Sequence, residues 1–285
     1  MSETASNEWT ELVGGVDFGE GPRWHEGELW YSDFYHQRVY RVGMDGQRTT
    51  VLELHDRPSG LGWLPNGDLL VVSMTARQVL RHDGEIISVH AELGEFAPAN
   101  CNDMIVDATG NAYVGHFGFD LEARADFAPA SLLLVRPDGS VEVAAADMAF
   151  PNGTVITPDG RTLICGQSFG GDYVAFDIED DATLTNRRQW AAIPGTAPDG
   201  CTLDAAGGIW FSDARGDQVI RVVEGGEVTD RIPTPQPTFA CMLGGPDGRT
   251  LFALCAVGSH PDQVAGSGAG AIVMQTVEHP KAGLP

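Results

Sequence analysis

Two stretches of this 285-residue chain repeat one pattern: Phe150–Gln167, FPNGTVITPDGRTLICGQ, and Ala197–Asp213, APDGCTLDAAGGIWFSD. In each, Pro, an oxygen-bearing side chain and Gly lead into an apolar run, a Gly-containing turn and a second apolar run. Apolar, β-branched runs on both sides of such a turn are typical of a β-hairpin. The repetition predicts several copies of one hairpin-based unit, which differ mainly in the polar residue between Pro and Gly.

Six such units follow one another, at intervals of 40 to 50 residues, and their first turns are centred on Gly27, Gly67, Gly110, Gly160, Gly207 and Gly248. A second turn follows in several units, so each unit would hold four strands. We therefore expect an all-β fold, a six-bladed β-propeller with four-stranded blades forming a single domain over residues 1–285. The N-terminal WTELV segment would add an outer strand that closes the ring. An all-β sandwich with accidental regularity is the alternative.

The composition is strongly acidic, with a net charge of −23. Such a surface repels nucleic-acid phosphates and anionic lipid, so neither nucleic acid nor a membrane is an expected partner. No apolar run reaches the ~18 residues of a membrane span, and MSETASNEWTEL does not resemble a secretory signal. The 5 cysteines show no zinc-like spacing, and we expect a reduced, cytoplasmic protein.

One position, polar in most units, lies eight residues before the first turn glycine. It falls on Ser59, Asn102, Asn152, Asp199 and Ala240, and a count of seven from Gly27 reaches Glu20. These positions open the innermost strand of each blade, and inner strands line the channel of a propeller. The six residues should therefore form a ring at one mouth of the channel.

This ring is rich in hard oxygen donors, which Glu20, Asn102, Asn152 and Asp199 supply. Carboxylate and amide oxygens are typical ligands of Ca²⁺, Mg²⁺ or Mn²⁺, whereas a tetrahedral zinc site usually contains thiolates. Two carboxylates on one axis repel each other unless a cation or a proton intervenes. We therefore expect one divalent metal ion in the channel. Alternatively, each Pro-Asn-Gly or Pro-Asp-Gly is only a local turn.

A second set of residues should face the same mouth one strand further out: Asp33, Ser73, His116, Gln167, Asp213 and Cys255. Aromatic residues such as Phe34, Tyr35 and Phe117 stand beside them, which predicts a pocket wall of mixed chemistry. His116 would either contact substrate or be a hydrogen-bonded wall residue. Asp33 and Asp213 would bind loop amides. The cysteines near the ring, Cys101, Cys201 and Cys241, fit packing better than nucleophilic catalysis.

The stretches GEGPRW, CNDMIVDATGNAYVG, FPNGTVITPDGRTLI and PDGCTLDAAGGIWFSD resemble the SMP-30/gluconolactonase/LRE family, also called regucalcin-like proteins. The resemblance extends from about Gly15 to about Val277. It implies a six-bladed propeller that holds one divalent metal ion, with Glu20, Asn152 and Asp199 as ligands and Asp199 as general base. Ca²⁺ is the expected ion, with Mg²⁺, Mn²⁺ or Zn²⁺ as alternatives.

The same resemblance places Asn102 beside the metal or the substrate, and Asp103 completes the family's Asn-Asp pair. Sugar-lactone members often carry Arg two residues before that pair, where this chain has Asn100. The segment Gly115–Asp120, GHFGFD, is also more aromatic than expected for a sugar site. Asn100, Asn102, Asp103, His116 and Phe117 are therefore the candidate substrate-binding residues, and gluconolactone itself is a doubtful substrate.

The function expected from these residues is a metal-dependent hydrolase that opens a sugar lactone or another small lactone. The small ring residues Ser59 and Ala240 would leave one side of the metal open to water or substrate. Two alternatives remain: another metal-assisted reaction of a carbonyl or ester substrate (isomerisation, elimination or ester hydrolysis), and a non-enzymatic, metal-stabilised binding propeller.

Overall fold

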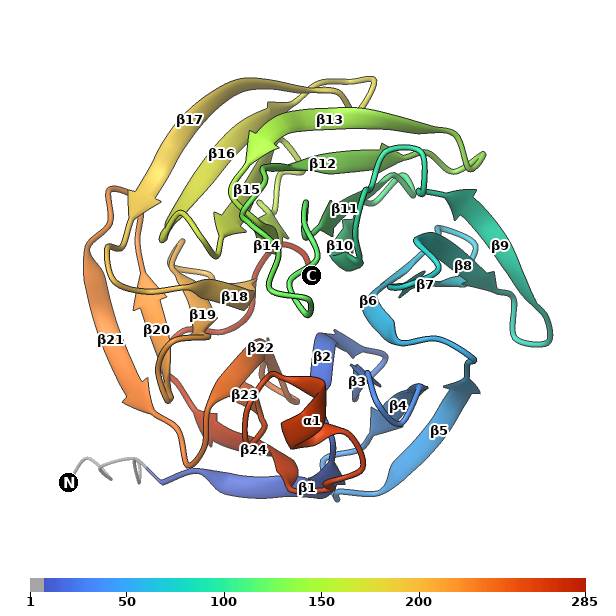
Figure 1. Cartoon of the computed structure of the whole chain (residues 1–285). Helices are drawn as coiled ribbons and strands as arrows, with labels where there is room; N and C mark the ends of the chain where they lie inside the picture. The colour runs from blue at the N-terminus through green and yellow to red at the C-terminus, as the bar shows by residue number, and fades with distance from the viewer. Residues whose placement is uncertain (1–7) are drawn as a thin grey trace.

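The computed structural model describes residues 8–285 of the chain. Six four-stranded antiparallel sheets stand around one axis like blades (Figure 1). This arrangement confirms the predicted all-β six-bladed propeller and excludes the sandwich alternative. The first seven residues of the predicted domain lie outside the described residues.

The first three blades each take four consecutive strands, running from the axis outward. Blade 1 comprises β2 (Gly19–His25), β3 (Glu28–Asp33), β4 (Arg38–Val42) and β5 (Arg48–Glu53). Blade 2 comprises β6 (Pro58–Trp63), β7 (Leu69–Ser73), β8 (Gln78–His82) and β9 (Ile87–Glu92). Blade 3 comprises β10 (Cys101–Val106), β11 (Ala112–His116), β12 (Ala130–Val135) and β13 (Val141–Met148).

The next two blades follow the same order. Blade 4 comprises β14 (Pro151–Ile156), β15 (Thr162–Gln167), β16 (Asp172–Ile178) and β17 (Leu184–Ala192). Blade 5 comprises β18 (Pro198–Leu203), β19 (Ile209–Asp213), β20 (Gln218–Val222) and β21 (Val228–Pro233).

Blade 6 joins the two ends of the chain. It comprises β22 (Thr238–Gly244), β23 (Thr250–Cys255), β24 (Gly270–Thr276) and, outermost, the N-terminal β1 (Thr10–Val16). Strand β1 runs antiparallel to β24, with Thr10 opposite Met274 and Val16 opposite Gly270. The prediction that the N-terminal segment closes the ring is therefore confirmed.

The predicted turns are present in every blade. All six first-turn glycines have positive φ values, from 71° at Gly160 to 93° at Gly110, a backbone region that favours glycine. The inner strands are buried along almost their whole length, as in β14 and β18, whereas an outer strand such as β17 is mostly exposed or half-buried. The apolar core therefore lies between neighbouring blades.

The inner strands approach one another closely at the axis. A Cβ at Gly200 in β18 would lie 2.7 Å from the Cβ of Ala240 in β22, and one at Gly21 in β2 would lie 2.6 Å from the Ser59 carbonyl oxygen. Such distances leave no room for a side chain. This close approach explains why glycine follows the polar ring residue in GEG, PSG, PNG and PDG.

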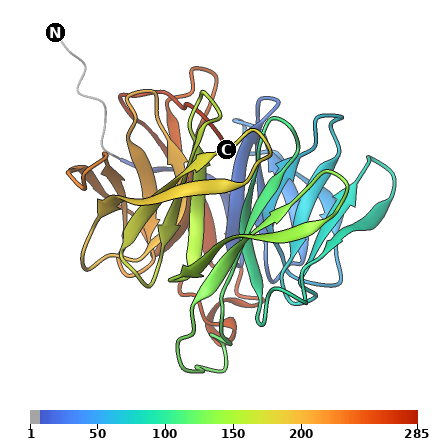
Figure 2. The same cartoon turned by 90° about the horizontal axis from the view of Figure 1, so that it is seen from above.

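The two ends of the channel are covered differently, as Figure 2 shows. The long β11–β12 connection and the short helix α1 (Pro261–Val264) lie on one face, and the C terminus lies on the other. The C-terminal segment is held by bridges between Leu284 and Ile156 and between Lys281 and Asp204. No helix in the described part of the chain has the length and apolarity needed to cross a bilayer.

Candidate active site

The predicted ring residues occupy equivalent positions in the six inner strands. Glu20, Ser59, Asn102, Asn152 and Asp199 are each the second residue of their strand, and Ala240 is the third residue of β22. All six are buried. The register predicted from sequence counting therefore brings these six positions to the same level of the channel.

Four of the ring residues line a cavity of about 450 Å³ at this mouth: Glu20, Asn102, Asn152 and Asp199. We refer to them as the polar floor. Ser59 is fully buried beside them, with its hydroxyl 3.5 Å from Oδ1 of Asn102. The floor thus combines two carboxyl groups and two amides that come from blades 1, 3, 4 and 5.

Hydrogen bonds of ordinary length orient two of the floor side chains, Glu20 and Asn152. The Gly21 N–H donates to Oε2 of Glu20 at 3.0 Å, and the Gly153 N–H donates to Oδ1 of Asn152 at 3.1 Å. The Asn152 amide also donates from Nδ2 to the Ser168 hydroxyl at 3.2 Å. Each of these oxygens keeps a lone pair for another partner, since an amide or carboxylate oxygen accepts more than one bond.

Burial dominates the electrostatics of the floor. It raises the pKa of Asp199 to about 8, and Asp103 and Asp213 add to the rise while backbone and Asn152 hydrogen bonds oppose it. Burial, followed by the negative charges of Asp199 and Asp103, holds the pKa of Glu20 well above its usual range. Within residues 8–285, neither carboxyl forms an ion pair with Arg or Lys.

These residues fit a hard divalent cation. A cation would relieve the repulsion between the two buried carboxyls, and the remaining donors are the amide oxygens that Ca²⁺ accepts. Within the described residues, no group of three or more His, Cys, Asp and Glu side chains is placed to hold a metal ion. Asn152 or Asn102 would therefore have to complete the ligand set.

The second set of predicted residues lies directly behind the floor. In every blade the first residue of the inner strand pairs with the last residue of the next strand, which places Asp33, Ser73, His116, Gln167, Asp213 and Cys255 together around the mouth. Asp33 accepts from the Asp17 N–H at 3.0 Å, and Asp213 accepts from the Ala197 N–H at 2.9 Å. Their predicted structural roles are confirmed.

Of the predicted substrate-binding residues, Asn102 and Phe117 line the cavity, and Asn100, Asp103 and His116 do not. Asp103 points to Arg23, whose Nη2 donates to its Oδ1 at 2.7 Å. Asn100 lines a smaller neighbouring cavity, and its carbonyl accepts from the Phe117 N–H at 2.9 Å.

His116 is enclosed by its own loop. The Gly118 N–H lies 3.1 Å from Nδ1, and the Ser131 N–H lies 2.9 Å from Nε2. Burial lowers the pKa of His116 to about 4. The side chains of Asp103 and His116 are thus engaged within the protein, which favours a supporting role for these two residues. Substrate contact by Asn100 stays a prediction, because this residue lines the neighbouring cavity.

Several residues of the cavity wall were not predicted by counting positions from the turn glycines. The missed residues are mainly aromatic or charged: Phe18, Arg57, Phe150, Phe169 and Phe239, with Leu121, Glu122 and Arg124 from the β11–β12 connection. A signal was present for three of them, because Phe18, Arg57 and Phe150 stand two residues before a ring position. In the structure these three residues lie in the connections just before β2, β6 and β14.

The cysteines near the axis are buried and unpaired. Burial raises the pKa of the Cys101 thiol to about 12, and it also raises the pKa of the Cys201 thiol. Because the thiolate is the nucleophile, these groups are poor candidates for covalent catalysis. The interpretation as packing residues agrees with their position.

The fold and the site define a class: a six-bladed β-propeller with an oxygen-rich small-molecule site at one mouth of its axis. Within this class the chain belongs to the SMP-30/gluconolactonase/LRE-like family, whose model matches residues 18–256. The predicted family resemblance is thereby confirmed.

Three similar proteins illustrate the relationship. The chain is 27% identical over 249 residues to a 6-deoxy-6-sulfogluconolactonase of Pseudomonas putida, covering 82% of this chain and 81% of the relative. It is 28% identical over 260 residues to an L-arabinolactonase of Azospirillum brasilense, covering 87% and 84%. The crystal structure of a calcium-binding protein, regucalcin from Agrobacterium tumefaciens, has a TM-score of 0.82 at 20% identity, covering 98% of this chain and 96% of that one, which shows a shared fold.

Proposed function

We propose that this chain hydrolyses lactones and that Glu20, Asn152 and Asp199 hold one divalent metal ion at the polar floor. The observation that carries the proposal is the convergence of these three buried oxygen-bearing side chains, from three blades, on one cavity. The two curated relatives support the reaction class, since both are named as lactonases. The calcium-binding regucalcin supports Ca²⁺ as the expected ion.

A bound divalent ion would supply Lewis-acid chemistry, polarising a carbonyl and making a nearby water more acidic. Asp199 is the proposed general base and takes a proton from the attacking water. Asn102 lines the same floor and can donate a hydrogen bond from its amide to a substrate oxygen. Hydrolysis adds one water: the carbonyl carbon gains a hydroxyl, the ring C–O bond breaks, and the former ring oxygen gains a proton.

The protonation state of Asp199 is central to this role. Burial raises its pKa to about 8, so without a neighbouring cation the group holds a proton at neutral pH. A positive charge nearby favours the carboxylate, which is the form that can accept a proton. The proposal therefore predicts that the protein hydrolyses lactones only when the metal ion is bound.

The test is a metal-reconstitution assay. The protein is stripped with EDTA, dialysed, and supplied separately with Ca²⁺, Mg²⁺, Mn²⁺ or Zn²⁺, and lactone opening is followed by acid release and by a product mass one water heavier. Asp199→Asn and Glu20→Gln should each reduce kcat/KM at least about 100-fold, as loss of a base or a metal ligand does. The exposed Asp217→Asn is the matched control and should behave like the wild type. Full activity of the stripped protein would exclude the metal role.

We also propose a cytoplasmic location, because all five cysteines are unpaired and disulfides are rare in reducing compartments. Cell fractionation tests this, and recovery from an oxidising compartment would contradict it.

A further inference from the structure

The wall of the cavity changes character away from the polar floor. Directly above the floor stand apolar side chains from five blades, which we call the aromatic belt: Phe18, Phe34, Met74, Phe117, Phe150 and Phe239. Phe18 and Phe150 precede their floor residues by two positions and lie in the connections that lead into β2 and β14.

The belt is closely packed. The Phe18 ring lies 5.1 Å from Phe34 and 4.8 Å from Phe239, and Phe150 stacks on Phe117 at 4.6 Å between ring centroids. A polar neighbour, Ser168, is already engaged, because its hydroxyl donates to the Pro198 carbonyl oxygen at 2.6 Å. Several hydroxyls of a sugar ring would therefore be desolvated against phenyl rings without replacement hydrogen bonds.

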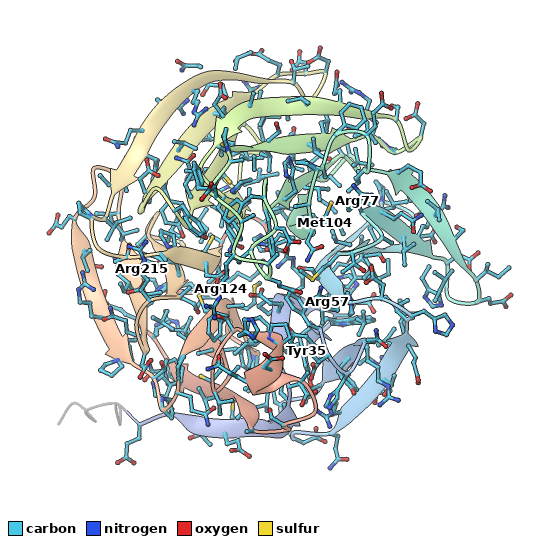
Figure 3. All side chains as sticks on the ribbon, in the orientation of Figure 1. Tyr35, Arg57, Arg77, Met104, Arg124 and Arg215 are labelled. Carbon is cyan, nitrogen blue, oxygen red and sulfur yellow. The ribbon has the colours of Figure 1, made fainter. Side chains whose placement is uncertain are left out.

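Charged side chains stand outside the belt, at the entrance. Arg57 is paired with Glu122 of the β11–β12 connection. Arg124 and Arg215 also line the cavity, and within residues 8–285 neither guanidinium forms a hydrogen bond or an ion pair. Figure 3 shows Arg57 and Arg124 around the centre of the ring, with Arg215 toward blade 5.

Two unpaired arginines at this entrance are notable in a chain of net charge −23. Most basic residues of the described chain are used in ion pairs or bonds to carbonyl groups, such as Arg23 with Asp103 and Arg221 with Asp204. A free guanidinium binds carboxylate, sulfonate or phosphate groups well. The entrance is therefore locally attractive to an anion that the rest of the surface repels.

We propose, on the basis of the lactonase function above, that the substrate is a lactone with an apolar or aromatic body and an anionic group at the end away from the ring carbonyl. The carbonyl lies at the polar floor, the body lies against the aromatic belt, and the anionic group contacts Arg124 and Arg215. Sugar lactones, which carry hydroxyls where the belt is apolar, are poor substrates.

Three lactones test this with the metal-loaded protein: γ-(para-carboxyphenyl)-γ-butyrolactone, neutral γ-phenyl-γ-butyrolactone and D-glucono-δ-lactone. We expect the carboxylated lactone to exceed the neutral aryl lactone in kcat/KM by about threefold to tenfold, the effect of one or two partly exposed charge pairs. Gluconolactone should be the slowest. If gluconolactone is hydrolysed faster than both aryl lactones, the proposal is overturned.

The arginines are tested by the double variant Arg124→Gln/Arg215→Gln. The ratio of kcat/KM for the carboxylated over the neutral aryl lactone should fall toward one, and added NaCl should reduce the same ratio in the wild type. The control is Arg161→Gln/Arg249→Gln, which removes two exposed arginines from turns that do not line the cavity. An equal ratio in the wild type and both double variants would contradict the role of Arg124 and Arg215.

A binding measurement tests the proposed substrate class independently of the proposed lactone hydrolysis. If no lactone is opened with any of the four metal ions, the proposed function fails, and calorimetry with the non-hydrolysable γ-(para-carboxyphenyl)-γ-butyrolactam decides the inference. Binding that Arg124→Gln/Arg215→Gln weakens supports an apolar, anionic ligand. Absence of binding, or equal binding by that variant, overturns it.

Discussion

The Arg23 guanidinium in β2 donates from Nη2 to Oδ1 of Asp103 in β10 at 2.7 Å, across the inner strand of the blade between them. Arg23 also donates from Nε to the Leu61 carbonyl at 2.9 Å, so one side chain links three blades beneath the polar floor. Asp103, which the Asn-Asp pair had marked as a candidate for substrate binding, is thus part of the structural support.

Removal of one partner of this buried pair should be costly. Asp103→Asn leaves the Arg23 charge buried without a counter-charge, and we expect the free energy of unfolding to fall by about 3 kcal/mol. Urea denaturation of metal-free protein measures this loss. Glu53→Gln, which breaks the exposed pair with Arg38, should leave the free energy of unfolding nearly unchanged. Equal losses for the two variants would show that Arg23 and Asp103 contribute no more than a surface pair.

Stability of the metal-free protein should depend on pH through the polar floor. The pKa of Asp199 rises from 3.8 to about 8 and that of Glu20 also rises, so the folded state holds protons that the unfolded state releases. The contribution of these two groups to stability is therefore complete below about pH 4 and is lost as the pH rises toward about 8.

Thermal unfolding in EDTA measures this dependence. We expect the part of the melting temperature that depends on these two groups to decline as the pH rises through that window. Added Ca²⁺ should make this decline smaller, because the ion favours the charged carboxylates. Glu20→Gln/Asp199→Asn removes both groups and should lose this part of the pH dependence. A wild-type protein whose curves coincide with those of the variant at every pH would refute the explanation.

His116 should remain neutral through the physiological range. Burial lowers its pKa to about 4, so unfolding takes up a proton below the ordinary value of 6.5. The contribution of His116 to stability is therefore complete above about pH 6.5 and is lost as the pH falls toward about 4. Imidazole NMR signals, assigned with His116→Gln, should move only below about pH 5. Titration near neutral pH would instead make His116 a candidate for proton transfer.

Close packing at the axis predicts a strong effect at Gly200. A methyl group there would meet the Ala240 side chain at 2.7 Å, so Gly200→Ala should destabilise the fold by about 3 kcal/mol. Gly94→Ala is the control, because its nearest contact beyond the chain neighbours is the Arg77 side chain at 3.6 Å. Denaturation midpoints compare the two variants. Little change at Gly200 would mean that blades 5 and 6 can separate at the axis.

Much of the fold was readable from the sequence because its determinants are local. A turn glycine and alternating apolar residues specify each hairpin within about ten residues, and the spacing of the hairpins specifies the number of blades. Even the ring positions followed, since each lies at the second or third residue of its inner strand and therefore at the same level. The roles of Glu20, Asn152 and Asp199 as metal ligands remain predictions.

Other features depended on contacts between segments far apart in the chain. Asp103 and Asn102 are neighbours in sequence, yet alternation along β10 sends one to Arg23 and the other to the cavity. Arg124 and Arg215 come from the β11–β12 connection and from the turn between β19 and β20, whose paths no local pattern specifies. Sequence by itself therefore determined the six blades and the identity of the polar floor. Only the tertiary structure decided which neighbouring side chains face the cavity, because that depends on how the blades pack against one another.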